Sequence, residues 1–194
     1  RLESSSADVY LALANVYRAR GEIGRAIRIH QNLLMRPDLP DGLRREAQLG
    51  LALAFRSGGF LARSTASFQE LIEAEPGNVA ALRELERIHV EAGEWEAAID
   101  VRRRIGARDE HTSRVLAHLW TGLGRVRAQE GDEREARRAF QRGLRADRGC
   151  AEARLALADQ ALRMGKPTRA IAHALRTHLP QQQLAVSGTL IVAR

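Results

Sequence analysis

The residues that could carry out chemistry in this sequence are six histidines, one cysteine and many arginines. The histidines lie at positions 30, 89, 111, 118, 173 and 178, and no two of them have the HExxH spacing or another paired spacing of a metal site. Because Cys150 is the only cysteine, it can form neither an internal disulfide nor a thiolate zinc site. There is also no phosphate-binding loop and no nucleophile elbow. We therefore predict that the chain is not an enzyme and that this segment holds no cofactor.

Arginine is the most distinctive charged residue. The chain has 31 basic and 24 acidic residues, which gives a net charge of +7, and Lys166 is the only lysine. Guanidinium groups bind carboxylates and phosphates in bidentate fashion. The charge is therefore compatible with an acidic peptide, a nucleic acid or an anionic lipid surface. A genome that prefers arginine codons would produce the same excess.

The bulk composition favours a helical protein. The chain has 194 residues, of which 44% are hydrophobic and only 4% aromatic, and Ala and Leu recur throughout. This suits one domain or a short repeat array with closely packed helices. No apolar run approaches the ~18–20 residues that span a membrane. The sequence begins at Arg1 without an initiator methionine or a signal peptide, so we expect it to be a segment of a longer protein.

A repeat in the sequence predicts the elements that position the charged residues. Gly21, Gly59, Gly93, Gly131 and Gly165 are separated by 38, 34, 38 and 34 residues. Five residues after each glycine stands a small side chain, namely Ala26, Ser64, Ala98, Ala136 and Ala170. A glycine is favoured where a helix ends in a left-handed conformation. A small residue is favoured where a second helix crosses the first most closely. The pattern predicts a series of helix–turn–helix units.

This spacing resembles the 34-residue tetratricopeptide repeat. The resemblance implies an all-α, right-handed superhelical solenoid of about five helix–turn–helix repeats, which forms a single array over residues 1–194. The predicted repeats cover residues 7–40, 45–78, 79–112, 117–150 and 151–184, and residues 185–194 begin a further or capping helix. Four-residue insertions near 41–44 and 113–116 are about one helical turn long. They are expected to lengthen two of the first helices.

The resemblance also implies an inner groove lined by the first helix of each repeat. The predicted partner-binding residues are Asn15, Arg18, Arg56, Arg83, Arg87, His118 and Arg125. Acidic residues occur on the same faces, at Asp8, Glu46, Glu91, Glu152 and Asp159. Two interpretations stay open at this point: a basic groove that binds an acidic segment, and a groove of mixed charge in which these arginines pair with the acids.

One stretch has a more specific resemblance. The run RGE-x-x-RAIRIHQNL from Arg20 to Leu33, followed by FLARSTASFQEL (60–71) and EWEAAIDV (94–101), resembles the early repeats of the lipopolysaccharide assembly protein B family. Members of that family are bacterial inner-membrane adaptors with an N-terminal anchor, a cytoplasmic repeat array and a C-terminal rubredoxin-like zinc domain. The resemblance implies location at the cytoplasmic face of the inner membrane. This sequence has neither an anchor nor a four-cysteine module, so zinc is expected only in a C-terminal domain outside it.

The predicted function is therefore a non-catalytic protein–protein interaction scaffold. The resemblance implies an adaptor that regulates lipopolysaccharide synthesis by linking a membrane-bound ATP-dependent protease to its substrate, the deacetylase that commits cells to lipid A synthesis. The partner would be a protein or peptide, with an acidic segment as one option. Two alternatives remain: a nucleic-acid-binding helical repeat, and a structural module that self-associates through exposed solenoid ends. Few aromatic residues and interspersed acids argue against nucleic acid.

Overall fold

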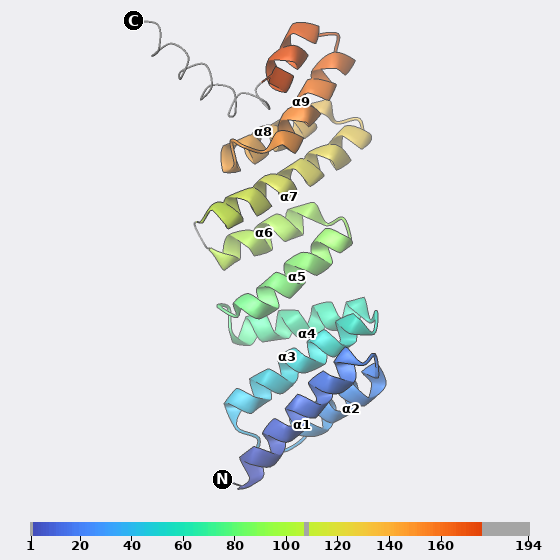
Figure 1. Ribbon diagram of the computed structural model, residues 1–194, viewed down its shortest axis with the longest axis vertical. Helices are drawn as coiled ribbons and strands as arrows, with labels where there is room; N and C mark the ends of the chain where they lie inside the picture. The colour runs from blue at the N-terminus through green and yellow to red at the C-terminus, as the bar shows by residue number, and fades with distance from the viewer. Residues whose placement is uncertain (1, 107–108, 176–194) are drawn as a thin grey trace, which may run out of the picture. The chain divides into compact units, whose positions relative to one another are not determined.

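The computed structural model describes residues 2–106 and 109–175, which form helices without any strand in these ranges (Figure 1). The chain divides into two compact units, Arg1–Ala92 and Gly93–Arg194. The first unit contains α1 (Leu2–Ala19), α2 (Ile23–Leu34), α3 (Asp41–Ser57), α4 (Leu61–Ala74) and α5 (Val79–Glu91). The second contains α6 (Trp95–Ile105), α7 (Glu110–Gln129), α8 (Glu133–Ala146) and α9 (Ala151–Arg163), and residues 167–175 are also helical. The predicted all-α fold is confirmed.

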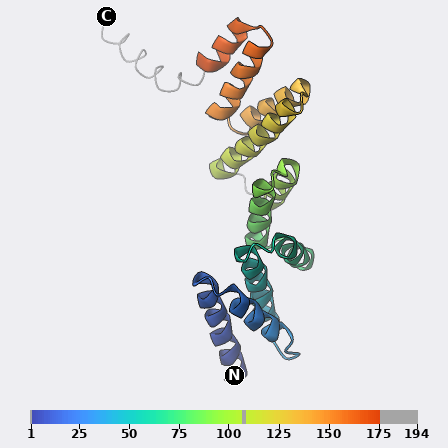
Figure 2. The same ribbon diagram turned by 90° about the vertical axis from the view of Figure 1, so that its right-hand side faces the viewer.

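Within each unit, helices that follow one another in sequence pack side by side (Figures 1 and 2). The odd-numbered helices are the first helices of the predicted repeats, and the even-numbered ones are the second helices. First helices also contact each other, α1 with α3 and α7 with α9. The boundary between the units falls at Gly93, between the two helices of the predicted third repeat. The predicted helix at 185–194 lies outside the described residues, and the single array remains a prediction.

The turns between first and second helices form at the predicted glycines. Gly21, Gly59, Gly93, Gly131 and Gly165 have φ values of +80°, +76°, +75°, +85° and +66°. No atom lies within 4 Å of where a Cβ would stand at any of the five. The left-handed backbone, rather than crowding, therefore selects glycine. At the fourth turn, the amide of Asp132 donates to the carbonyl of Arg127 at 2.9 Å and closes the end of α7.

The small side chains after each turn lie at buried helix crossings. Ala26, Ala98 and Ala136 are fully buried, as is Ser64, whose hydroxyl donates to the carbonyl of Ala52 at 3.0 Å. Because this hydrogen bond pairs the Ser64 hydroxyl, the polar side chain can be buried at a helix crossing without the cost of an unpaired donor. The predicted packing role of these positions is confirmed.

Among the first helices after α1, which has 18 residues, α3 and α7 are longer than α5 and α9, as the insertions predict. Helix α3 has 17 residues and α7 has 20, whereas α5 and α9 have 13 each. The longer α7 begins at an N-cap, where the amide of Thr112 donates to the carboxylate of Asp109 at 2.6 Å. This hydrogen bond lowers the pKa of Asp109 below its usual value.

Two glycines inside α7 serve packing. A Cβ on Gly122 would overlap the Trp95 ring, and a Cβ on Gly124 would overlap the Phe140 ring. Because these two glycines have no Cβ, the Trp95 ring of α6 and the Phe140 ring of α8 can pack directly against α7. None of the helices in the described part of the chain combines the length and apolar character needed to cross a membrane.

Candidate protein-interaction surfaces

All seven predicted partner-binding residues lie on first helices. In the first unit, Asn15 and Arg18 lie on α1, Arg56 on α3, and Arg83 and Arg87 on α5; in the second unit, His118 and Arg125 lie on α7. The structure brings some of them together within each unit. Their role in partner binding remains a prediction.

Arg18 and Asn15 lie near the end of α1. The Arg18 guanidinium donates to the side-chain oxygen of Asn15, with Nη2 and Oδ1 3.5 Å apart. Arg18 is half-buried, and its positive charge acts on His30 of α2. Burial first, and the Arg18 charge second, lower the pKa of His30 from 6.5 to about 4. His30 is fully buried.

Arg56 is committed to a structural contact. It pairs with Glu84, and its Nη2 lies 2.6 Å from Glu91 Oε1, both on α5. Its side chain is only 16% exposed. Two carboxylates on one guanidinium leave it little capacity for a ligand. Arg56 therefore ties α3 to α5 in the first unit.

Arg83 and Arg87 are the accessible pair on α5. Arg87 lies 3.6 Å from Glu84, but its side chain is 60% exposed. Arg83 is exposed and forms no ion pair with the described residues. The two arginines are four residues apart, so one turn of α5 presents both. They form the candidate anion-binding point of the first unit.

In the second unit, one glutamate of α9 joins both predicted residues of α7. Glu152 Oε2 lies 3.4 Å from Arg125 Nη2 and 3.7 Å from His118 Nδ1. The three side chains are 52–56% exposed. At such exposure an ion pair contributes only ~0–1 kcal/mol, so a partner can replace it.

A hollow of about 450 Å³ lies beside this cluster, mainly between α7 and α9, and we call it the α7–α9 hollow. Its lining residues are Arg125, Ala128, Gln129, Phe140, Glu152, Leu155, Ala156, Asp159 and Arg163. Leu155 is 56% exposed, and Asp159 pairs with Arg163 at 2.7 Å. The sequence analysis missed Leu155 and Arg163, although both lie on a first helix, α9, as the predicted groove residues lie on other first helices.

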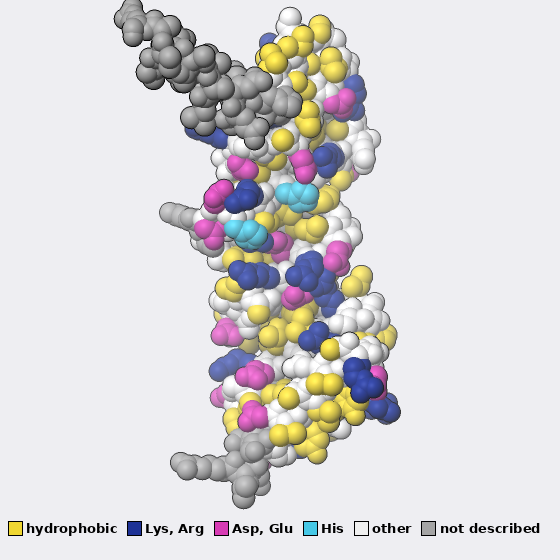
Figure 3. Space-filling model, viewed as in Figure 1, with side chains coloured by type: hydrophobic (Ala, Val, Ile, Leu, Met, Phe, Trp, Pro, Cys, Tyr) yellow, Lys and Arg dark blue, Asp and Glu magenta, His cyan; other side chains and the backbone are white. Residues whose placement is uncertain are grey.

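The charge on these faces is mixed. Of the five acids predicted on them, Glu91, Glu152 and Asp159 pair with arginines, whereas Asp8 and Glu46 form no ion pair in the described part of the chain. Figure 3 shows basic and acidic side chains interspersed with apolar ones over the face it presents. Such a surface favours a partner with both charged and apolar residues.

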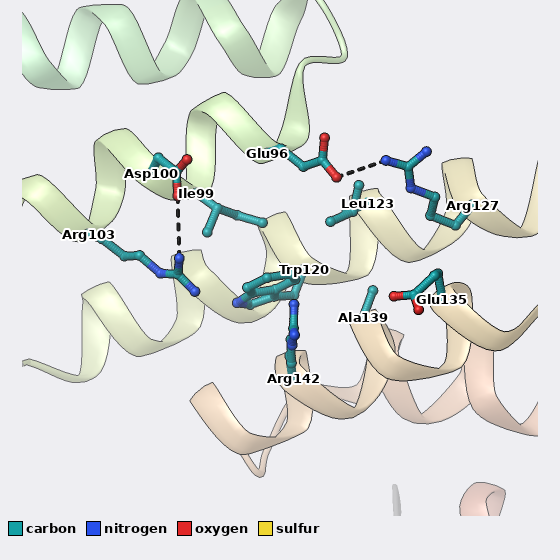
Figure 4. Close-up of a pocket in the computed structure, with 10 residues that line it drawn as sticks. All are labelled: Glu96, Ile99, Asp100, Arg103, Trp120, Leu123, Arg127, Glu135, Ala139 and Arg142. Carbon is teal, nitrogen blue, oxygen red and sulfur yellow. Dashed lines mark hydrogen bonds and ion pairs between the residues drawn. The ribbon is translucent and has the colours of Figure 1, made fainter. Parts of the chain in front are cut away.

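A second concavity lies among α6, α7 and α8, and we call it the Trp120 cleft. It encloses about 320 Å³ (Figure 4). The guanidinium carbons of Arg103 and Arg142 lie 5.5 Å and 4.8 Å from the Trp120 ring centroid. Trp120 is 9% exposed, so it is packed among the helices and also lines the cleft. The sequence analysis missed the cleft because its residues come from three helices of two repeats.

An ion-paired network closes one end of the Trp120 cleft. Arg127 lies 2.8 Å from Glu96 of α6 and 2.8 Å from Glu130. Hydrogen bonds to these two carboxylates raise the pKa of Arg127 further above its usual value. At the other end, Arg103 pairs with Asp100 at 3.3 Å. No group of three or more potential metal ligands occurs among the described residues.

Comparison with known proteins identifies the repeat. The tetratricopeptide repeat family matches residues 9–44, 49–110 and 121–183. The chain belongs to the tetratricopeptide repeat family. Family membership supports a protein-interaction scaffold.

Curated relatives include lipopolysaccharide assembly protein B from two bacteria. The Escherichia coli (strain K12) protein is 28% identical over 189 residues, which covers 97% of this chain and 48% of that protein. The Haemophilus influenzae protein is 27% identical over 168 residues, or 86% of this chain and 42% of that protein. The resemblance noted from the sequence is confirmed. The chain spans about half the length of these relatives.

Similar solved structures share the repeat fold. The crystal structure of MamA protein has a TM-score of 0.57 at 19% identity and covers 92% of this chain and 93% of that one. MamA from Desulfovibrio magneticus RS-1 has a TM-score of 0.54 at 15% identity and covers 90% of this chain and 96% of that one. At this identity, the similarity shows the tetratricopeptide fold alone.

Proposed function

We propose that this chain is the interaction array of a non-catalytic adaptor that regulates lipopolysaccharide synthesis. It would link a membrane-bound ATP-dependent protease to its deacetylase substrate at the cytoplasmic face of the inner membrane. The observation that carries the proposal is the similarity to lipopolysaccharide assembly protein B along 97% of the chain. Because the similarity extends over nearly all repeats, it includes the faces that would contact the partners.

The contacts on the first helices indicate how a partner would bind. Arg83 and Arg87 offer two guanidinium groups to a carboxylate-bearing segment in the first unit. In the second unit, Leu155 offers an apolar contact inside a rim of paired charges. A segment that buries Leu155 gains roughly 1.5–3 kcal/mol from apolar area. The paired charges at the rim would select for a complementary sequence.

The proposal is tested by changing the two candidate binding sites, the Arg83/Arg87 pair and Leu155, in separate variants. The Arg83→Glu/Arg87→Glu variant reverses both charges, and Leu155→Asp places a charge in the α7–α9 hollow. Charge-assisted contacts contribute ~1.5–3 kcal/mol each when desolvated, so loss of both arginines should weaken binding by roughly two or more orders of magnitude. Binding is measured by calorimetry and pull-down with the purified protease and deacetylase.

The matched control is Arg28→Glu/Arg45→Glu. These two arginines are exposed on α2 and α3, outside the predicted groove positions, and the variant changes the net charge equally. We expect the control to bind normally and all variants to keep the melting temperature of the parent within a few degrees. If neither protein binds the unaltered chain, the proposed partners are wrong. If the partners bind the control less tightly than the groove variants, the binding surface is wrong.

A further inference from the structure

Helix α8 exposes a row of arginines that the proposed function does not use. Arg134, Arg138, Arg142 and Arg145 follow one another at intervals of four, four and three residues, and all are exposed. This spacing places them along one side of the helix. The opposite side carries Ala136, Ala139, Phe140 and Gly143, all of them buried. At 1.5 Å per residue, the row extends over about 16 Å.

Most of this row has no counter-charge. Arg138 pairs with Glu135, but Arg134, Arg142 and Arg145 form no ion pair within the described ranges. Two arginines of the first helices differ in this respect, since Arg56 and Arg125 both pair with glutamates. Like charges four residues apart destabilise a helix by a few tenths of a kcal/mol per pair. An anionic occupant would remove this repulsion.

The Trp120 cleft lies beside this row and shares Arg142 with it. Figure 4 shows Arg142 directed from α8 towards Trp120 of α7, with Arg103 of α6 reaching the same ring. Both guanidinium carbons lie within 5.5 Å of the ring centroid. Arg103 has Asp100 as its partner, whereas Arg142 lies over the indole and forms no ion pair with another described residue. The cleft volume of about 320 Å³ exceeds the volume of one side chain.

We propose that the α8 arginine row and the Trp120 cleft together form a second docking surface, and that its occupant is an acidic segment of a partner protein. One acidic side chain of that segment would lie beside Trp120 and bind Arg142. Further acids would bind Arg134 and Arg145. This surface is separate from Arg83, Arg87 and the α7–α9 hollow, so it goes beyond the proposed function.

The surroundings of the cleft favour a protein segment over other polyanions. Glu96, Asp100 and Glu135 also line the cleft, and they would repel a continuous row of phosphates. A peptide can place a carboxylate at Arg142 and neutral or basic residues opposite these acids. Trp120 is too buried, at 9% exposure, to offer a face for base stacking. A flat lipid surface cannot enter a recessed cleft.

The first experiment uses Trp120 as its own reporter. Trp95 and Trp120 are the two tryptophans, so a Trp95→Phe background leaves only Trp120 emission. The probe is a synthetic helical peptide of about twelve residues, long enough to follow the row, with Glu at every fourth position. We expect it to shift Trp120 emission and to bind about tenfold or more tightly than the same peptide with Gln. Equal binding of the two peptides, or no change in Trp120 emission, would overturn the proposal.

The second experiment compares two triple variants of equal charge. Arg134→Gln/Arg142→Gln/Arg145→Gln removes the unpaired part of the row, and Arg28→Gln/Arg45→Gln/Arg169→Gln removes three exposed arginines elsewhere. The first should lose about tenfold in affinity for the Glu peptide, and the second should keep it. The Arg83→Glu/Arg87→Glu variant should also keep its affinity for the Glu peptide. The test of the second docking surface is therefore independent of the test of the proposed function.

Two further outcomes would also contradict the proposal. An equal loss of affinity for the Glu peptide in both triple variants would mean that net charge alone attracts the peptide. Tighter binding of phosphatidylglycerol vesicles or of a single-stranded oligonucleotide than of the Glu peptide would mean that the partner class is wrong. Melting curves of each variant confirm that the fold is retained.

Discussion

His30 shows how a single residue adapts to the repeat. It occupies a position where the tetratricopeptide pattern has an aromatic residue, and it is fully buried on α2. Its ring lies against Gly50 of α3, where a Cβ would overlap it. Neither ring nitrogen has a hydrogen-bond partner in the structure. Burial and the nearby Arg18 lower its pKa to about 4, so the ring is neutral at pH 7 and packs as an apolar group.

The buried ring predicts a pH-dependent stability. The unfolded chain takes up a proton near pH 6.5, whereas the folded protein does so only near pH 4. The free energy of unfolding should therefore fall as the pH is lowered from 6.5 to 4, by about 2–3 kcal/mol, and this contribution should level off at lower pH. In His30→Leu, which cannot titrate, this part of the decrease should be absent. Urea unfolding at pH 7.0, 5.5 and 4.5 measures the free energy of unfolding of both proteins. If this free energy changes with pH equally in the parent and in His30→Leu, the lowered pKa of His30 is wrong.

At the scale of the elements, helix pairs are held at a fixed separation by small residues. Ala98 on α6 and Ala136 on α8 have no exposed surface, and each lies five residues after its turn glycine. The interior is close-packed, so it has no room for a larger side chain at these crossings.

Enlarging these residues should therefore destabilise the protein. We expect Ala98→Leu and Ala136→Leu each to lower the free energy of unfolding by roughly 1–3 kcal/mol, because the branched side chain overpacks the crossing. Ala62→Leu on the exposed side of α4 is the control and should change it little. Thermal melts followed by circular dichroism report the difference. Parental stability in both buried variants would refute the repeat register.

The contact between α3 and α5 rests partly on Arg56. Its guanidinium pairs with Glu84 and Glu91, and the Arg56 and Glu84 side chains are 16% and 18% exposed. Because both side chains are largely buried, loss of one partner would leave the other charge poorly solvated and without its counter-charge.

A double-mutant cycle measures this contact. We expect Arg56→Ala to lower the free energy of unfolding by about 1–3 kcal/mol, partly because Glu84 then lacks its cation. The double variant Arg56→Ala/Glu84→Ala should lose less than the sum of the single variants, with a coupling of at least about 0.5 kcal/mol. The pair Arg138→Ala and Glu135→Ala on the α8 surface provides the comparison and should show weaker coupling. Additive effects at Arg56 would mean that the ion pair is not stabilising.

At the scale of the whole molecule, the candidate binding residues lie on exposed helix faces within each of the two units. Two compact units each present charged helix faces, and stability in such repeats comes mainly from contacts between neighbouring elements. The residues that could bind metal are dispersed: the described part of the chain has no group of three His, Cys, Asp or Glu side chains suited to a metal ion.

We therefore expect the purified chain to carry no stoichiometric zinc. With Cys150 as the only cysteine, a zinc site would need histidine and carboxylate ligands brought together from separate helices. Elemental analysis after purification without a metal-binding tag measures the content. One zinc per chain, retained through dialysis against a chelator, would contradict this prediction.

Local pattern in the sequence was enough to predict the repeat. These features depend on positions within one or two helices: the turn glycines, the small residues that follow them, and the greater length of α3 and α7 relative to α5 and α9. Such features are visible in sequence because helix periodicity and backbone conformation are local properties. The faces that carry the candidate groove residues follow from the same periodicity.

Which arginines are already paired depended on tertiary packing. Arg56 and Glu84 are 28 residues apart, and Arg125 and Glu152 are 27 apart, so their contacts appear only when neighbouring repeats pack. The same packing brings Arg103, Trp120 and Arg142 from three helices into one cleft. It leaves Arg134 and Arg145 of α8 without an ion pair to any residue of 2–106 or 109–175. Side-chain pairing between helices depends on rotamers and interhelical distance, and composition does not encode these. The sequence therefore predicted which helix faces carry charged residues, and the tertiary structure determined which of these charges remain available to a partner.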